Sequence, residues 1–165
     1  MNLKDKNIII TGGSLGIGKE TARFLTEKGA NVLVTGRSEE RLLKVKSYTG
    51  AKHIIFDIAD LDHISEKARE CLSILDNRVD VLINNAGTGV RRSIEEITVE
   101  DFLEVYNVNV FGLSLLTKEI TPVMKRQKNG TIINIGSTAS LKGYKNGSIY
   151  SSSKFAVRSL TQRWQ

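Results

Sequence analysis

A hydroxyl, a phenol and an ammonium group lie within a short stretch of this sequence, at Ser137, Tyr150 and Lys154. Residues four apart on a helix share one face, so a helix here would place Tyr150 beside Lys154. A phenol has a reference pKa of about 10, and a neighbouring ammonium lowers that pKa by favouring the phenolate. Such a tyrosine could exchange a proton with a substrate oxygen that Ser137 holds. The residues indicate chemistry in which a hydride moves to or from carbon, although Tyr and Lys at this spacing also occur by chance.

A glycine-rich stretch follows the apolar run Ile8–Ile10. Its spacing, Gly-x-x-x-Gly-x-Gly, allows a tight turn and lets a pyrophosphate approach backbone N–H groups at a helix N-terminus. The spacing differs from the common Gly-x-Gly-x-x-Gly fingerprint, and any strand-to-helix turn can contain two or three glycines. The stretch predicts a dinucleotide site that contains Gly12, Ser14, Leu15, Gly16, Ile17 and Gly18.

Charged residues follow the next two apolar runs. Arg37 stands where an NAD enzyme would place a carboxylate for the ribose hydroxyls, and an arginine there favours the 2′-phosphate of NADP. Glu39 and Glu40 close by keep NAD(H) possible. Asp57 ends the third run, where its carboxylate could bind an adenine amino group or cap the next helix, a role that Asp60 fits better.

Asparagine side chains occupy two further positions. The turn Asn84-Asn85-Ala86-Gly87 follows the fourth apolar run, and its amides could tie neighbouring strands together or line the floor of a cofactor site. Asn109 falls on the apolar face of a predicted long helix, where an unsatisfied amide would cost on the order of 1–3 kcal/mol. It is therefore either a core residue bonded to a neighbouring backbone or a part of the site. That face contains Phe102, Val105, Tyr106, Leu113, Leu116 and Ile120.

Short β-branched runs alternate with longer amphipathic stretches along the whole chain. The runs predict strands at Asn7–Thr11, Asn31–Thr35, Lys52–Phe56, Val79–Asn84 and Thr131–Ile135. The amphipathic stretches predict helices at Ile17–Lys28, Glu39–Tyr48, Leu61–Leu75, Val99–Arg126 and Ile149–Trp164. This alternation predicts one α/β domain over residues 1–165, with a doubly wound, Rossmann-like parallel sheet in three α/β/α layers. Ligands bind such a sheet at the carboxyl ends of its strands, which is where the residues named above lie.

Composition argues against several other classes of protein. Lys and Arg outnumber Asp and Glu by 24 to 18, but the cations form no dense run with interleaved aromatics, so nucleic acid is a poor candidate partner. No apolar run is long enough for a signal peptide or a membrane span. The single cysteine, Cys71, cannot form an internal disulfide, and with only His53 and His63 it makes no metal-ligand cluster. We expect a cytoplasmic protein with no metal.

The motifs together resemble the short-chain dehydrogenase/reductase (SDR) family. The stretch Thr11–Gly18 matches the family's TGxxxGxG loop, Asn84–Gly87 matches its NNAG turn, and Asp57 matches its adenine-contacting aspartate. Its catalytic tetrad is matched, in order and spacing, by Asn109, Ser137, Tyr150 and Lys154. The resemblance spans Asn7 to about Leu160.

The resemblance implies an oxidoreductase that transfers a hydride between NADP(H), or less favourably NAD(H), and a carbonyl or secondary alcohol. Tyr150 would be the acid/base, Ser137 would position the substrate oxygen, Lys154 would bind the nicotinamide ribose and lower the tyrosine pKa, and Asn109 would hold a water of the proton relay. The implied cofactor-binding residues are Gly12, Ser14, Leu15, Gly16, Ile17, Gly18, Arg37, Asp57, Ile58, Asn85, Ala86, Gly87, Tyr150 and Lys154.

Members of the family continue through two more strands and a substrate loop, so the sequence is expected to be a C-terminally truncated member without the last strands of the fold. Thr131–Ile135 would then be an exposed apolar edge. The family also dimerises through the helices predicted at Val99–Arg126 and Ile149–Trp164, which implies a homo-oligomer, either a dimer or a tetramer. The segments Thr88–Arg92 and Leu141–Asn146 indicate a polar, basic rim around the substrate, which the sequence does not identify.

Two other functions are compatible with the sequence. The first is a truncated, catalytically inactive nucleotide-binding or assembly module, in which a partner covers the edge at Thr131–Ile135. The second, weaker alternative is a sugar-nucleotide epimerase or dehydratase of the family's extended branch, whose usual loop spacing differs from that of Gly12, Gly16 and Gly18.

Overall fold

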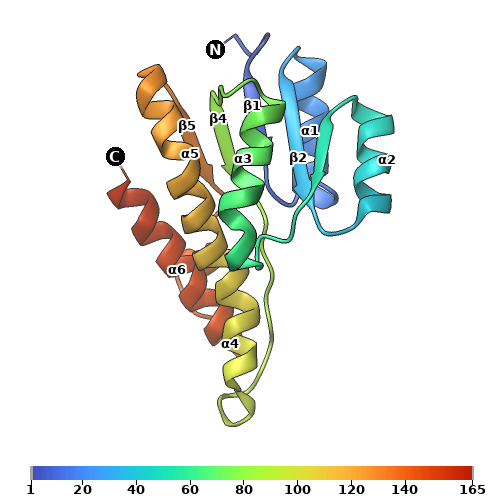
Figure 1. Cartoon of the computed structure of the whole chain (residues 1–165). Coiled ribbons are helices and arrows are strands. Elements are labelled where there is room, and N and C mark those ends of the chain that lie inside the picture. The colour runs from blue at the N-terminus through green and yellow to red at the C-terminus, as the bar shows by residue number, and fades with distance from the viewer. Residues whose placement is uncertain (1, 165) are drawn as a thin grey trace.

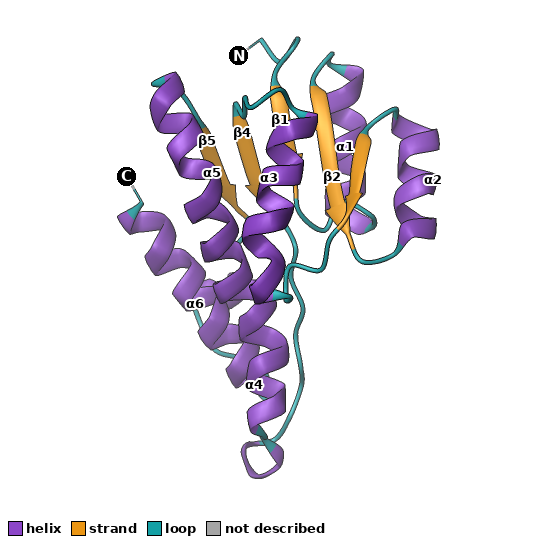
Figure 2. Cartoon of the chain, viewed as in Figure 1, coloured by secondary structure: helices purple, strands orange, loops and turns teal. Residues whose placement is uncertain are grey.

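Five parallel strands form one sheet in the computed structural model, which describes residues 2–164 (Figures 1 and 2). The strand order is β3-β2-β1-β4-β5, so the chain adds strands on one side of β1 and then returns to its other side. This arrangement confirms the predicted doubly wound fold. The strands are β1 (Asn7–Ile10), β2 (Asn31–Gly36), β3 (Lys52–Ile55), β4 (Val81–Asn84) and β5 (Thr131–Asn134).

Helices connect the strands, and α1, α2 and α6 begin and end within one residue of the predicted bounds. The α-helices are α1 (Gly16–Glu27), α2 (Glu39–Thr49), α3 (Ile64–Ile74), α4 (Val99–Tyr106), α5 (Leu113–Gln127) and α6 (Ser148–Arg163). Shorter turns are η1 (Leu61–His63), η2 (Ile94–Glu96), the π-helical η3 (Asn107–Gly112) and η4 (Thr138–Ser140). Within residues 2–164, no helix combines the length and apolarity needed to cross a membrane.

Alternate residues of each strand serve two separate cores, because successive strand side chains point to opposite faces. On one face, Ile9 and Leu82 pack with residues of α3 and α5, including Ala68 and Leu116. On the other face, Ile8, Ile10, Val32, Val34, Val81 and Ile83 pack with Ala22 of α1 and with Leu42 and Val45 of α2. The sheet is therefore the middle layer of three, as predicted and as Figure 2 shows.

The predicted helix Val99–Arg126 is interrupted. The π-helical turn η3 separates α4 from α5, so the apolar face that a regular helical period predicts does not continue through it. Asn109 and Leu116 are buried as expected, whereas Phe102 is 42% exposed and its assignment to the core was wrong. Gly112 is the last residue of η3, and a Cβ there would overlap the backbone oxygen of Ile58. The chain comes this close to the β3–α3 loop only because residue 112 has no side chain.

β5 lies at one edge of the sheet and pairs with β4 alone among the described strands. Ile133 on this strand is 42% exposed, so the predicted apolar edge is present in residues 2–164.

Replacing Gly112 with alanine should lower the free energy of unfolding by about 1–3 kcal/mol, because the added methyl group overpacks the contact with Ile58. Urea denaturation followed by circular dichroism measures the change. Gly143→Ala is the matched control, since a Cβ at exposed Gly143 meets no atom within 4 Å. An unchanged midpoint for Gly112→Ala would contradict this account of the interrupted helix.

Candidate active site

The loop after β1 meets the loop after β4 at the point where the strand order reverses. Thr11 Oγ1 accepts hydrogen bonds from the backbone N–H groups of Asn85 and Ala86, both at 3.1 Å. The Asn85 amide donates back to the carbonyl oxygens of Thr11 and Gly12, at 3.0 and 3.1 Å. Gly12 has a φ of +64°, and a Cβ on it would lie 2.8 Å from the Cα atom of Ala86. Glycine is needed here both for the left-handed backbone and for the close approach of the two loops.

Helix α1 begins at this loop with its N-terminal N–H groups available. Its N-cap residue is Leu15, which makes no side-chain capping bond, and its first turn contains no acidic residue. An uncapped helix N-terminus carries partial positive charge and unpaired N–H donors, which suit an anion such as a pyrophosphate. The fit to a dinucleotide phosphate therefore rests on free donors as well as on the glycines.

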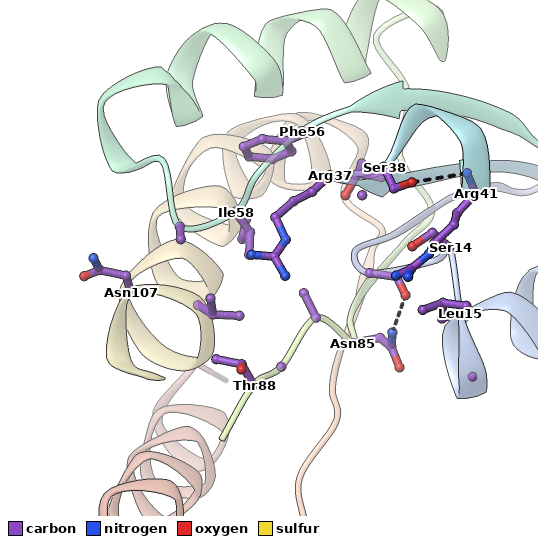
Figure 3. Close-up of a pocket in the computed structure, with 18 of the residues that line it drawn as sticks. Ser14, Leu15, Arg37, Ser38, Arg41, Phe56, Ile58, Asn85, Thr88 and Asn107 are labelled. Atoms are coloured by element: carbon purple, nitrogen blue, oxygen red, sulfur yellow. Dashed lines mark hydrogen bonds between the residues drawn. The ribbon is translucent and has the colours of Figure 1, made fainter. Parts of the chain in front are cut away.

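A cleft of about 700 Å³ extends from this loop across the carboxyl ends of β2, β3 and β4 to the start of η3 (Figure 3). Its size lies in the range of small-molecule sites. It is lined by residues of the α1 loop, by those that follow β2, β3 and β4, and by one side of α4 and η3. Of the predicted cofactor residues, the lining includes Gly12, Ser14, Leu15, Gly16, Arg37, Ile58, Asn85, Ala86 and Gly87.

The sequence did not single out Ser38 and Arg41, which also line the cleft. Ser38 caps α2, its Oγ accepting from the backbone N–H of Arg41 at 3.4 Å. Figure 3 shows the guanidinium groups of Arg37 and Arg41 both directed into the cleft, Arg41 beside Ser14. The signal for Arg41 was its spacing, since it follows Arg37 by four residues and lies in the first turn of a helix that starts at the cleft.

Glu39 and Glu40, which kept NAD(H) possible in the sequence, do not line the cleft. Glu40 pairs with Lys44 along α2, which lowers the pKa of the Glu40 carboxyl through a hydrogen bond. Both glutamates are exposed in the first turn of the helix. The positive groups of this segment therefore lie in the cleft, and its negative groups lie outside.

Asp57 lies at the border of the cleft, 3.9 Å from Arg37, and its Oδ1 accepts from the backbone N–H of Ala59. Asp60 occupies the N-cap position of η1, as predicted, but its side chain makes no capping hydrogen bond there. Its carboxylate instead pairs with the His63 ring at 2.8 Å, and this hydrogen bond lowers the pKa of Asp60 and raises that of His63.

Ile17 and Gly18 lie behind the glycine loop. Ile17 is exposed on a separate shallow surface with Thr21 and Phe24. Gly18 is buried, and a Cβ on it would lie 2.5 Å from both the Gly12 oxygen and the Asn85 amide. Gly18 thus permits the close packing of α1 against the loop.

Ser137 follows β5 and caps the short turn η4. Its Oγ accepts a hydrogen bond from the backbone N–H of Ala139 at 3.0 Å, so its own proton is available for donation to another oxygen. The side chain of Ser140 reciprocates by accepting from the backbone N–H of Ser137 at 3.2 Å. This capping box holds Ser137 at the carboxyl edge of the sheet.

Tyr150 and Lys154 lie one turn apart on α6, as predicted. The Lys154 Nζ atom is 5.9 Å from the centre of the Tyr150 ring and donates to the backbone oxygen of Ile135 at 2.8 Å. Lys154 is only 5% exposed, and burial lowers its pKa. Both side chains border the loop after β4, since a Cβ on Gly87 would lie 3.6 Å from the Lys154 Nζ and one on Gly89 would lie 2.9 Å from the Tyr150 ring. The pair therefore stands beside the end of the cleft that Gly87 lines.

Asn109 is fully buried in η3, and its amide is satisfied by the protein. Its Oδ1 accepts from the backbone N–H of Thr88, and its Nδ2 donates to the Thr88 oxygen, both at 2.9 Å. Nδ2 also donates to Ser153 Oγ at 3.0 Å. The side chain thus ties the loop after β4 to α6, which is the backbone-bonded alternative that the sequence left open.

Asn84 ties neighbouring strands together. Its Nδ2 donates to Asn134 Oδ1 at 2.8 Å and to Thr117 Oγ1 at 3.0 Å. The Asn134 Nδ2 in turn donates to Thr161 Oγ1 of α6 at 2.9 Å. This network joins β4, β5, α5 and α6. Within residues 2–164 no group of three or more His, Cys, Asp or Glu side chains could hold a metal ion.

Comparison with known proteins agrees with this geometry. Residues 6–165 match the family model described as short chain dehydrogenase, and the chain belongs to that family. An uncharacterised oxidoreductase of Thermotoga maritima is 39% identical over 98% of this chain. The chain spans 65% of the length of that relative.

Solved structures show the same likeness. A metagenomic short-chain oxidoreductase in complex with NADP superposes with a TM-score of 0.92 at 31% identity, over 98% of this chain and 76% of that one. A short-chain dehydrogenase/reductase from Burkholderia phymatum in complex with NAD gives a TM-score of 0.91 at 28% identity, over 98% of this chain and 59% of that one. Nicotinamide cofactors thus bind proteins of this fold.

Replacing Lys154 with methionine should change how stability depends on pH. Burial lowers the pKa of Lys154, so the folded state releases its proton at lower pH than the unfolded state, whose reference value is 10.5. The cost of burying the charge is therefore relieved as the pH rises from the lowered value towards 10.5, and the unaltered chain should gain stability relative to Lys154→Met.

Urea denaturation of both proteins at pH 7 and pH 9.5 measures this difference. Lys125→Met, at an exposed position of α5, controls for the general loss of a lysine. A stability difference that stays constant, or moves in favour of Lys154→Met at high pH, would show that the ammonium is not held at a cost.

Proposed function

We propose that this chain forms the cofactor-binding and proton-transfer part of an NADP(H)-dependent oxidoreductase acting on a carbonyl compound or secondary alcohol. The observation that carries the proposal is the juxtaposition of a dinucleotide-sized cleft with Tyr150 and Lys154 at its end, on a helix that packs against the η4 turn capped by Ser137. When bound, the cofactor supplies or accepts the hydride. The remaining steps fall to side chains of this chain.

Positioning begins with the cofactor phosphates. The pyrophosphate would lie at the uncapped N-terminus of α1, against a loop that Thr11 and Asn85 hold rigid. The adenine would lie between Asp57 and Ile58, and the nicotinamide ribose would reach Lys154 past Gly87. The names of the two solved relatives in complex with NADP and NAD support a cofactor of this class.

The preference for NADP(H) rests on the charges of the cleft. The 2′-phosphate would lie near Arg37, with Ser38 and Arg41 as further donors. Charge-assisted hydrogen bonds from a guanidinium to phosphate are among the stronger interactions in proteins. Glu39 and Glu40, which could have selected the ribose hydroxyls of NAD(H), do not line the cleft, and Glu40 pairs with Lys44; both facts support the same choice.

Proton transfer is assigned to Tyr150. In the reductive direction its hydroxyl gives a proton to the substrate oxygen as the carbon receives a hydride, and Ser137 donates a second hydrogen bond to that oxygen. The buried ammonium of Lys154 stabilises the phenolate that remains. Asn109 fixes the position of helix α6 relative to the loop that follows β4. Its amide is already occupied, so the proposed relay water would approach the second lone pair of Oδ1 or the backbone.

We also propose that the protein forms a homo-oligomer in a reducing, cytoplasmic setting. The aromatic rings of Phe102, Tyr106 and Phe111 contact one another in tilted pairs, with centroids 6.0 and 6.1 Å apart, and Phe102 and Phe111 are exposed, which favours pairing of this side of α4 and η3 with a second copy. Cys71 is a free buried thiol whose pKa is raised to about 12 by burial, and such a thiol is stable in a reducing cytoplasm.

NADPH should bind the purified chain more tightly than NADH, and Arg37→Ser should weaken NADPH binding about 10- to 100-fold while leaving NADH unchanged, because only NADPH carries the 2′-phosphate. Titration followed by cofactor fluorescence measures both. Arg69→Ser removes an exposed arginine of α3 and serves as the control. Equal binding of NADPH and NADH would remove the case for NADP(H). A folded chain that binds neither would instead favour the inactive module.

Tyr150→Phe should lower the turnover number for ketone reduction about 10²- to 10⁴-fold, because it removes the proton donor while keeping the ring. NADPH affinity should change little. The absorbance of NADPH with a panel of ketones reports turnover, and Tyr48→Phe at an exposed position of α2 is the control. Full activity in Tyr150→Phe would refute the assignment.

A further inference from the structure

Charge is divided very unevenly along this chain. Residues 120–165 contain eight Lys or Arg residues and no Asp or Glu. Residues 1–119 contain 16 Lys or Arg residues and 18 Asp or Glu residues. The side chains that follow β5, including those that border Ser137 and Tyr150, therefore have no carboxylate of their own segment to neutralise them. Clefts and rims of one sign concentrate oppositely charged ligands.

Part of this positive charge lies beside the proton-transfer residues. The backbone N–H of Arg92, in the loop after β4, donates to the backbone oxygen of Asn146 at 3.0 Å. This bond joins the two segments that the sequence indicated as a basic rim. The first segment also contains Gly89, which packs against the Tyr150 ring.

The second segment is tied to Ser137 through Tyr144. The Tyr144 hydroxyl donates to Thr138 Oγ1 at 2.9 Å, and Thr138 is the residue after Ser137. The ammonium of Lys142 lies 5.5 Å from the centre of the Tyr144 ring. The Tyr144 ring thus connects this cation to Thr138, the neighbour of the residue that would hold the substrate oxygen.

Three cations of this rim have no carboxylate within 4.0 Å among residues 2–164: Arg91, Lys142 and Lys145. Arg92 is different, because Asp101 neutralises it at 3.3 Å. Glu95, Glu96 and Glu100 follow on η2 and α4, and Glu96 is engaged by Ser93. All three free cations are exposed and can meet a ligand from solvent.

The cofactor does not account for these cations. None of them lines the cleft, whose own positive groups, Arg37 and Arg41, follow β2 and are separated by strand β1 from β4 and its Gly87 loop. These cations could therefore bind an anion other than the cofactor. The substrate is the candidate, because it is the other ligand that the proposed reaction brings to Ser137 and Tyr150.

We propose that the substrate carries an anionic group, a carboxylate or a phosphate, beyond the carbonyl or hydroxyl that meets Ser137 and Tyr150. Lys142 and Lys145, with Arg91 from the facing loop, receive that group and select anionic substrates over neutral ones of the same carbon skeleton. The inference rests on the proposed function, since it concerns the substrate of the same site.

The test measures binding to the chain saturated with NADP⁺, which permits no reduction of a ketone. Calorimetric titrations compare acetoacetate with methyl acetoacetate, and acetoacetyl-coenzyme A with its neutral N-acetylcysteamine thioester. The first pair tests a carboxylate close to the ketone, and the second tests phosphates further away. The anionic member of at least one pair should bind about tenfold more tightly at low salt, the size expected for two exposed charge pairs, and raised salt should reduce this ratio.

Lys142→Gln/Lys145→Gln should bring the ratio close to one, while Lys125→Gln/Arg126→Gln, which removes the same charge from the far end of α5, should preserve it. Equal binding within both pairs, or no binding of any of the four compounds to the NADP⁺-loaded chain, would overturn the inference and leave the cofactor assignment intact. A folded chain that does not bind NADP⁺ would instead show that the proposed function has failed, and the inference would fall with it.

Discussion

The close approach of two backbone loops where the strand order reverses is the constraint on which the rest of the site depends. β1 and β4 are neighbours in the sheet although they are far apart in the sequence, so the turns that leave them must share one small space. Gly12 and Ala86 fill it with backbone and one methyl group, and Thr11 and Asn85 satisfy the polar atoms that this contact buries. A larger side chain at residue 12 would separate the loops and disturb the start of α1, whose N–H groups are proposed to bind the cofactor phosphates.

Helix α6 is the second element whose placement matters, because it carries both the phenol and the ammonium. Lys154 holds it to the end of β5 through the Ile135 oxygen, and Asn134 holds it through Thr161. Asn109 adds a third attachment by joining Ser153 to the loop after β4. The ammonium is therefore a structural donor and a source of positive potential at the same position. Its burial strengthens that potential, because less water is present to screen it.

Positive groups are distributed so that different anions can be held in different places. The N-terminal loop of α1, Arg37 and Arg41 line the cleft, and the basic rim of Arg91, Lys142 and Lys145 belongs to two joined loops, one of which packs against Tyr150. Some nearby carboxylates are engaged by other cations, since Glu40 pairs with Lys44 and Asp101 pairs with Arg92, whereas Asp57 lies 3.9 Å from Arg37. This separation explains how a chain with a modest net charge can present three distinct sites of positive potential.

The sequence by itself determined the fold class, the strands and the glycine loop, because each depends on local periodicity or on a backbone that only glycine adopts. It also placed Tyr150 and Lys154 on one face of a helix. The tertiary structure alone decided that Arg41 joins Arg37 in the cleft while Glu39 and Glu40 lie outside it. Side chains at neighbouring positions point in different directions, and which of them faces the cleft depends on how α2 packs against the sheet. The tertiary structure also decided that η3 interrupts the long helix at Asn109 and exposes Phe102, because that break depends on packing against Ile58, a residue distant in the sequence. Local patterns fix which residues form an element, whereas contacts between distant segments fix where each side chain points.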